Sequence, residues 1–204
     1  MDGLVANLGL ISGVAGSGAA RHTVLVAGVA GMIASSFSMA VGEYTSVQSQ
    51  TEATLAEVEN ERLELDRSPA AELEELAGMY RARGLDPDLA REVARQLSRD
   101  PETALRIHTQ EELGVDVDAL ASPWVAAGSS MVAVVIGSFL PLLPYVLGAG
   151  TIVPSLVLSG AALFTVGVLV SRFTTRGAVY SGLRQLLLGA ASAAITFGIG
   201  SLVK

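Results

Sequence analysis

The chain has 204 residues, of which 50% are apolar and 16% charged, with a formal net charge of −7 and a mean hydropathy of +0.51. It contains no cysteine, which excludes disulfides, zinc–thiolate sites and redox dithiols. Residues 119–171 form a run of 53 positions without Asp, Glu, Lys or Arg. A soluble all-α protein with a large core is the alternative to a membrane protein, but so long an uncharged run leaves no solvated helix face.

Five apolar segments are each about 20 residues long, which is the length needed to cross a bilayer core of roughly 30 Å. They are residues 3–20, 23–44, 123–144, 148–171 and 179–203. The first segment lacks the basic start of a cleavable signal peptide and leads directly into the second. The sequence therefore predicts an all-α, polytopic membrane protein with five transmembrane helices.

A charged insert separates the second and third segments. It carries 18 Asp and Glu against eight Arg. We therefore divide the chain into three parts: residues 1–45 with the first two transmembrane helices, the acidic insert at residues 46–122, and residues 123–204 with the other three transmembrane helices.

The insert is predicted to be helical, because its apolar residues recur at helical spacing. A proline follows each of Ser68, Asp86 and Asp100, which predicts three helix starts. Gly84 and Gly114 are typical of helix ends. No proline or glycine interrupts the chain between Thr45 and Arg67, so we expect the second transmembrane helix to continue into the insert.

The positions of the arginines predict the orientation of the chain. With five spans, the eight Arg of the insert lie on the same side of the membrane as Arg172 and Arg176, in the last connection. The opposite side has only Arg21 and Lys204. Lys and Arg are enriched in cytoplasmic loops. We therefore expect the N-terminus and the insert to be cytoplasmic.

Glycines in the first segment permit close helix packing. Gly9 and Gly13 form a GxxxG pair, and small residues at this spacing let helix backbones approach each other in lipid. Packing within one subunit and a seam between two subunits are both compatible with this pair.

Acidic side chains of the insert recur at spacings that place them on common helix faces. The sets are Glu57, Glu61 and Glu64 at i, i+4, i+7, then Glu72 and Glu75 at i, i+3, and His108 with Glu112 at i, i+4. A solvated acidic face is one interpretation; a divalent cation held between the helices is the other. Carboxylates with one imidazole and no thiolate suit Fe²⁺, Mn²⁺ or Mg²⁺. Several weak sites would suit a domain that captures metal and passes it on.

Two acidic residues fall at the apolar segments. Asp2 opens the first segment, and Glu43 lies near the end of the second, one turn after Met39. An ionisable group at membrane depth is costly unless paired or hydrated, so it indicates a functional site. The alternatives are an interfacial position in contact with water for both carboxylates and ordinary packing for Met39. On the functional hypothesis, the three side chains are ligands along a metal path.

Two stretches carry a resemblance to a known family. Residues 2–13 (DGLVANLGLISG) and 38–44 (SMAVGEY) strongly resemble the vacuolar iron transporter family, here a bacterial-type member. The resemblance extends over essentially the whole chain. It implies a homodimer in the inner (plasma) membrane that exports Fe²⁺, and in some members Mn²⁺, from the cytoplasm in exchange for protons. Such export serves metal homeostasis and detoxification.

The resemblance also implies ligands. The family's pore Asp and Met match Asp2 and Met39. Its cytoplasmic glutamate pairs match Glu61, Glu64, Glu72 and Glu75, and a Met and Glu four apart match His108 and Glu112.

The chain departs from the family pattern at three places. Members usually have further residues before the Asp-Gly-Leu motif, so we expect the first span to be short here. Gly31 stands where some members have a Glu, two turns before the Met. His108 replaces a Met, and because an imidazole must be neutral to bind metal, we expect weaker capture below about pH 6.5.

Rival functions remain open at this stage. The leading hypothesis is a transporter, and the alternative is a membrane-anchored divalent-metal buffer or sensor without transport. An enzyme is not expected, because helical di-iron sites use Glu-x-x-His and the residue three before His108 is Leu105. There is no GxxxxGK phosphate-binding motif, so ATP drive is not expected either. We expect no prosthetic group and no nucleic-acid partner.

Overall fold

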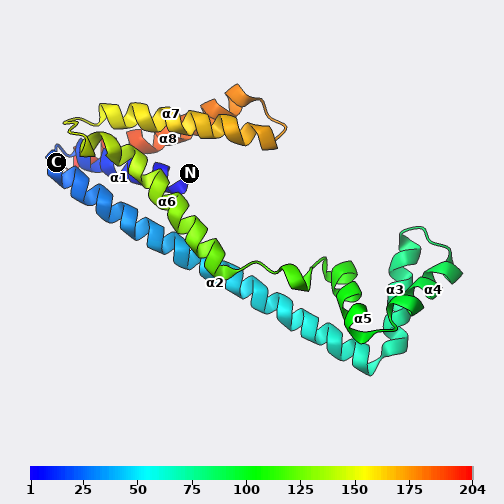
Figure 1. The fold of residues 1–204 in the computed structure, drawn as a ribbon. Coiled ribbons are helices and arrows are strands. Elements are labelled where there is room, and N and C mark those ends of the chain that lie inside the picture. The colour runs from blue at the N-terminus through cyan, green and yellow to red at the C-terminus, as the bar shows by residue number, and fades with distance from the viewer. Residues whose placement is uncertain (204) are drawn as a thin grey trace. The chain divides into compact units, whose positions relative to one another are not determined.

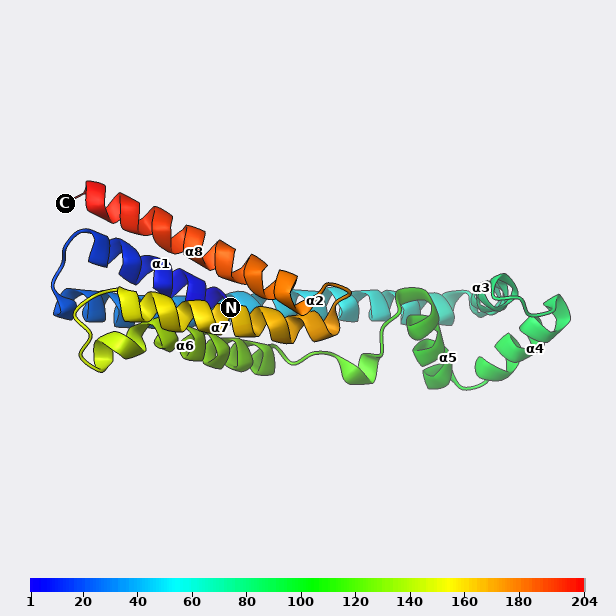
Figure 2. The ribbon, with the colours of Figure 1, turned by 90° about the horizontal axis from the view of Figure 1, so that it is seen from above.

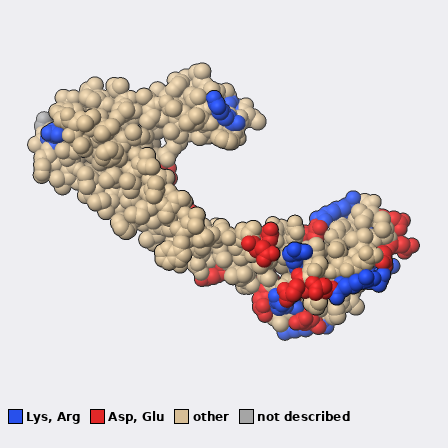
Figure 3. Space-filling view, viewed as in Figure 1, with Lys and Arg blue, Asp and Glu red and all other residues tan. Residues whose placement is uncertain are grey.

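The computed structural model describes residues 1–203, and this part of the chain is helical with no strand (Figure 1). It forms two compact units. The membrane unit comprises residues 1–44 and 124–203, and the insert unit comprises residues 45–123. One helix, α2 (Arg21–Arg67), runs without interruption from the first unit into the second, as its lack of proline predicts. Figure 3 shows that charged side chains gather on the insert unit, whereas the membrane unit presents very few.

Four helical stretches are long and apolar enough to cross a membrane. They are Arg21–Arg67, Val117–Val146, Val153–Phe173 and Ala178–Leu202. The first apolar helix, α1 (Asp2–Gly16), has only 15 residues and is about 22 Å long at the α-helical rise. The predicted count of five spans is therefore not confirmed, because only four helices reach the required length.

Two predicted boundaries in the membrane unit are wrong for the same reason. The first segment ends as a helix at Gly16, because the chain turns at Gly18, whose φ is +78°. The fourth segment begins at Val153, five residues later than predicted, because Gly148 has a φ of +107°. Glycine adopts this left-handed backbone without strain, and so it ends a helix where hydropathy alone would continue it.

Small residues hold the membrane unit together. The helix α8 (Ala178–Leu202) packs along α1 and along α7 (Val153–Val170), as Figure 2 shows. A Cβ on Gly9 would lie 3.2 Å from the Ser192 hydroxyl, and one on Gly13 would lie 3.3 Å from the Thr196 carbonyl. The predicted GxxxG pair therefore packs against a helix of the same chain.

The helix α6 (Pro123–Val146) is tied to α1 and α2 by polar contacts. The Asn7 side chain donates to the Ser138 carbonyl at 2.7 Å, and the Ser138 hydroxyl donates to the Gly3 carbonyl at 3.0 Å. Arg21 donates through Nε to the Tyr145 carbonyl at 2.9 Å, at the end of α6. Backbone carbonyls at a helix C-terminus lack intrahelical partners, so this guanidinium satisfies one of them.

The insert unit consists of the end of α2 and five further short elements. These are α3 (Pro69–Ala82), α4 (Pro87–Leu97), α5 (Pro101–His108) with a π-helical turn η1 (Thr109–Leu113), and a 3-10 turn η2 (Val117–Ala119). All three predicted proline starts are confirmed. Asp86 and Asp100 cap their helices by accepting backbone N–H bonds at 3.0 and 2.9 Å. Gly84 and Gly114 end α3 and η1 with positive φ.

The insert has a small apolar core between α3, α4 and α5. Leu76, Ala77 and Ala94 are fully buried there, with Leu97 and Ile107 packed against them. This core joins the three helices.

Candidate metal site

Three helices of the insert unit bring acidic side chains to one imidazole. Glu61 of α2, His108 of α5 and Glu112 of η1 offer ligand atoms that all lie within 4.8 Å of one another. A fourth residue, Glu72 of α3, places Oε2 3.8 Å from His108 Nδ1. The ligand atoms of Glu61, His108 and Glu112 are close enough to hold one ion, and we call these four residues the insert cluster.

Three of the four side chains in the insert cluster are buried, and several of their polar atoms lack hydrogen-bond partners. His108 is fully buried, Glu61 is 5% exposed and Glu72 is 7% exposed, whereas Glu112 reaches solvent. Glu61 Oε1 lies 2.9 Å from His108 Nδ1. Even so, neither this oxygen nor either ring nitrogen has a partner with hydrogen-bond geometry among residues 1–203. Buried polar atoms without partners are rare and costly, and a cation bound by these atoms would satisfy them.

Electrostatics in the insert cluster favours a bound cation or proton. Burial, followed by the negative charges of Glu112 and Glu72, raises the pKa of Glu61 to about 7. Burial, followed by the charge of Glu75, also raises the pKa of Glu72. The pKa of His108 is lowered by burial, against the opposing effect of Glu112 and Glu75. The lowered pKa of His108 favours the neutral imidazole that metal binding requires, and the raised pKa of Glu61 makes this carboxyl an expected site of proton competition near neutral pH.

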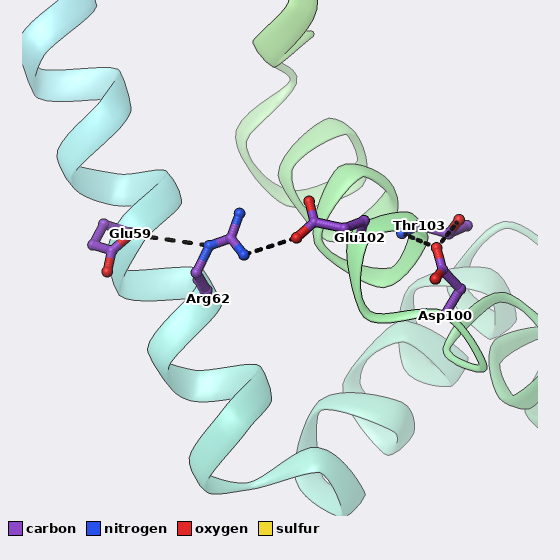
Figure 4. A network of polar contacts seen from close by, with 5 residues as sticks. All are labelled: Glu59, Arg62, Asp100, Glu102 and Thr103. Atoms are coloured by element: carbon purple, nitrogen blue, oxygen red, sulfur yellow. Dashed lines mark hydrogen bonds and ion pairs between the residues drawn. The ribbon is translucent and has the colours of Figure 1, made fainter.

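Four arginines of the insert form ion pairs, all with carboxylates outside the insert cluster. Figure 4 shows Arg62 reaching from α2 to Glu102 on α5, with Glu59 on its other side. The cross-helix pairs are Arg62 with Glu102 at 2.9 Å, Arg91 with Glu74 at 2.7 Å, and Arg83 with Glu111. In the part of the chain that the structure describes, no Lys or Arg forms an ion pair with a residue of the insert cluster. No arginine therefore neutralises the carboxylates of the cluster.

The ligand chemistry fits a divalent first-row metal. Carboxylate oxygens with one neutral imidazole suit Fe²⁺ and Mn²⁺ better than soft ions such as Cu⁺. One exposed carboxylate, Glu112, gives a hydrated ion access to the three buried side chains.

Glu64 and Glu75 lie beside the insert cluster, and both are exposed. They are not among the three residues whose ligand atoms converge. Their charges nevertheless help to raise the pKa of Glu72. Their role as ligands stays a prediction.

The three site residues predicted in the membrane unit are distant in sequence from the insert cluster. Asp2 is exposed in the first turn of α1, and Met39 and Glu43 are half-buried on α2. Within residues 1–203, neither Asp2 nor Glu43 belongs to a group of three His, Asp or Glu side chains close enough to hold an ion. Their role on a metal path also stays a prediction.

Sequence reasoning missed one feature of the site, the π-helical turn that carries Glu112. This turn contains Glu111, which pairs with Arg83 of α3. The motif has no simple sequence signal apart from the glycine that ends it.

Comparison with known proteins identifies similar chains. A model of the VIT family matches residues 1–201. A vacuolar iron transporter of Acanthamoeba castellanii is 38% identical over 196 residues, covering 88% of this chain and 69% of that protein. Vacuolar iron transporter 2 of Oryza sativa subsp. japonica is 30% identical over 206 residues, covering 100% and 84%. Vacuolar iron transporter 1 of Arabidopsis thaliana is 29% identical over 206 residues, covering 100% and 82%.

Proposed function

The chain belongs to the VIT family, and we propose from this premise that it transports divalent iron across a membrane. The observation that carries the proposal is a buried, unneutralised cluster of carboxylates and imidazole in a chain with four membrane-capable helices. Relatives named as vacuolar iron transporters support iron as the substrate. We propose manganese as a second substrate, because the same hard ligands suit both ions.

In this proposal the insert cluster captures the ion. Glu112 meets the hydrated ion at the surface, and Glu61, Glu72 and His108 replace part of its water shell. The exposed carboxylates Glu64 and Glu75 increase the local cation concentration.

The membrane path is proposed to use Asp2 of α1 and Met39 and Glu43 of α2. Continuity of α2 supports this assignment, because one helix carries both Met39 and the cluster residue Glu61. We count α1 as the fifth span in this proposal, which requires the bilayer to adapt to its short length.

The proposed assembly is a homodimer. An apolar stripe on α2 supports it: Val26, Val29, Ile33, Phe37 and Val41 are all more than 40% exposed. The residues recur every three or four positions and so share one helix face. At 100° per residue, Met39 and Glu43 lie on other faces of α2 than this stripe, so the stripe supports the dimer and not a path at its seam.

The proposed direction is export from the cytoplasm of a bacterial cell through the inner membrane, in exchange for protons. Its proposed role is metal homeostasis. The arginines of the insert and of the connection before α8 support a cytoplasmic insert. Relatives from eukaryotes are named for vacuoles, and vacuolar loading also removes metal from the cytoplasm.

The test is metal flux in proteoliposomes containing the purified full-length protein. We expect Fe²⁺ and Mn²⁺ flux that increases under an imposed pH gradient. Met39→Ala and Asp2→Ala should each reduce the flux, whereas the two variants should still bind Co²⁺ at the insert. Absence of flux of either ion in the wild-type protein, with and without a gradient, would overturn the proposal.

A metal buffer or sensor is the second candidate function. It is favoured by one observation, the confinement of the insert cluster to residues of the insert unit. Metal binding to the insert with flux unaffected by Asp2→Ala and Met39→Ala would support this second function.

A further inference from the structure

The π-helical turn η1 also makes a contact through Glu111, a residue outside the insert cluster. Glu111 forms an ion pair with Arg83 of α3 and accepts a hydrogen bond from the Tyr80 hydroxyl at 3.4 Å. The Arg83 guanidinium also lies 5.9 Å from the centre of the Tyr80 ring. The Glu111 side chain is only 20% exposed, which is less than either partner in the other arginine–carboxylate pairs of the insert. We call these three residues the Glu111 clamp.

The turn that contains Glu111 is of a rare type. A π-helical turn has i→i+5 hydrogen bonds, is rare, and occurs frequently at functional sites. It begins directly after His108 and contains Glu112, so two residues of the insert cluster flank its first three positions. The rotation of Glu112 about the helix axis relative to His108 therefore depends on whether this turn is π-helical or α-helical.

Two hydrogen bonds outside the helical ladder also involve this turn. Thr109 is buried and bonds through its hydroxyl to the Arg106 carbonyl at 3.1 Å, and the Val115 N–H donates to the Thr109 carbonyl at 3.3 Å. Both contacts lie at the ends of η1. The Glu111 clamp is the contact that fixes the middle of the turn to another helix.

We propose that Glu111 and Arg83 are positioning residues that hold η1 in its π-helical form, so that Glu112 reaches the same ion as Glu61 and His108. This inference rests on the proposed metal site of the insert. Without the clamp, the turn relaxes towards α-helical hydrogen bonding and rotates Glu112 away from the other two ligands. The clamp thus sets the number of carboxylates that the ion receives.

Co²⁺ binding to the full-length protein in detergent tests the proposal, with calorimetry for affinity and visible absorption for coordination. Glu111→Gln and Arg83→Gln should each weaken Co²⁺ binding about tenfold, the typical effect of removing a residue that orients a ligand. Both should change the absorption spectrum of bound Co²⁺. Arg83→Lys keeps the charge and should lie closer to the wild type. Arg91→Gln, which breaks an ion pair far from η1 in the sequence, is the matched control and should change neither readout.

The outcomes separate this inference from the proposed function. Wild-type affinity and spectrum in both Glu111→Gln and Arg83→Gln would overturn the clamp while leaving the metal site intact. Failure of the wild-type protein to bind Co²⁺ at all would overturn the metal site, and the clamp with it. Equal losses in Arg91→Gln would also overturn the clamp, because they would show a general effect of lost ion pairs. A charge exchange, Arg83→Glu with Glu111→Arg, should restore part of the affinity.

Discussion

The two units of this protein differ in what their buried polar groups contact. In the membrane unit, Asn7, Ser138 and Arg21 each donate to a backbone carbonyl of a neighbouring helix, and the polar contacts help to join helices. In the insert unit, Glu61 and His108 are buried close together with unpaired polar atoms and without a neutralising arginine. Buried polar atoms without partners also occur in the membrane unit, but those are neutral amide and hydroxyl oxygens. The difference in the insert is that the unpaired atoms there include those of ionisable groups, Glu61 and His108, which can bind a cation.

Changes to the insert cluster should have the largest effect. Glu61→Gln and His108→Ala should each weaken divalent metal binding by more than about 100-fold, because a ligand is lost and not merely its orientation. Calorimetry with Mn²⁺ or Co²⁺ on the full-length protein measures this effect.

Glu61→Gln should also stabilise the metal-free protein against heat, because it removes a buried charge repelled by Glu72 and Glu112. A variant that bound metal normally and melted at a lower temperature would show that Glu61 is a structural residue.

The next largest effect should be that of pH on the stability and the metal affinity of the insert. The pKa of Glu61 is raised from 4.5 to about 7, so between these values the folded state binds more protons than the unfolded state. Stability of the metal-free protein should therefore fall as pH rises from about 4.5 to about 7, and it should not fall further above that range. Metal affinity should change in the opposite direction, decreasing below about pH 7 as the proton competes.

Melting curves and Co²⁺ titrations at pH 5.5, 6.5 and 7.5 test this pH dependence. His108→Met should keep it, because burial lowers the pKa of His108, whereas Glu61→Gln should largely remove it. Loss of the dependence in His108→Met alone would assign the competing proton to the imidazole.

Close helix packing in the membrane unit should give a moderate effect. A Cβ on Gly16 would overlap the Phe197 carbonyl of α8, so Gly16→Ala should destabilise the protein by about 1–3 kcal/mol, as overpacking does. Gly198→Ala is the control on the facing helix, since nothing lies within 4 Å of its added Cβ. Thermal unfolding in detergent compares the two; equal melting temperatures would contradict the packing described here.

The smallest effect is expected for an exposed ion pair of the insert. Arg91 and Glu74 are each about half exposed, although their charged atoms lie 2.7 Å apart. Because solvent screens such pairs, Arg91→Gln should leave the melting temperature of the metal-free protein unchanged. A clear decrease would show that surface pairs, and not the apolar core around Leu76, join α3 to α4.

The amount that could be predicted from the sequence differs between the two units. In the insert, Asp86-Pro87 and Asp100-Pro101 are local signals, and both helices begin there. Sequence spacing placed Glu61 on an acidic helix face and His108 with Glu112 on another. Whether these two faces come together depends on how α2, α5 and η1 pack, which spacing does not predict. The π-helical form of η1 was missed because its stabilising partner, Arg83, lies 28 positions before Glu111.

In the membrane unit, hydropathy located the apolar segments but not their ends. The predicted first segment extended beyond Gly16, and the predicted fourth segment began at Gly148. Average hydropathy does not detect a glycine with positive φ, at which a helix ends. The resemblance to the vacuolar iron transporter family correctly identified the family, which covers residues 1–201. The GxxxG pair of α1 could not be assigned to a partner from sequence, since both Gly9 and Gly13 fit any close helix.

The most direct test of the central claim is the dependence of transport rate on metal concentration. Initial rates of Mn²⁺ flux in proteoliposomes should be measured for the wild-type protein and for Glu61→Gln, with the metal supplied on the side of the insert. Capture by the insert cluster predicts a higher half-saturating concentration in Glu61→Gln, with the maximal rate largely retained. An unchanged half-saturating concentration would show that ions reach the membrane helices without binding to the cluster, and would contradict this account.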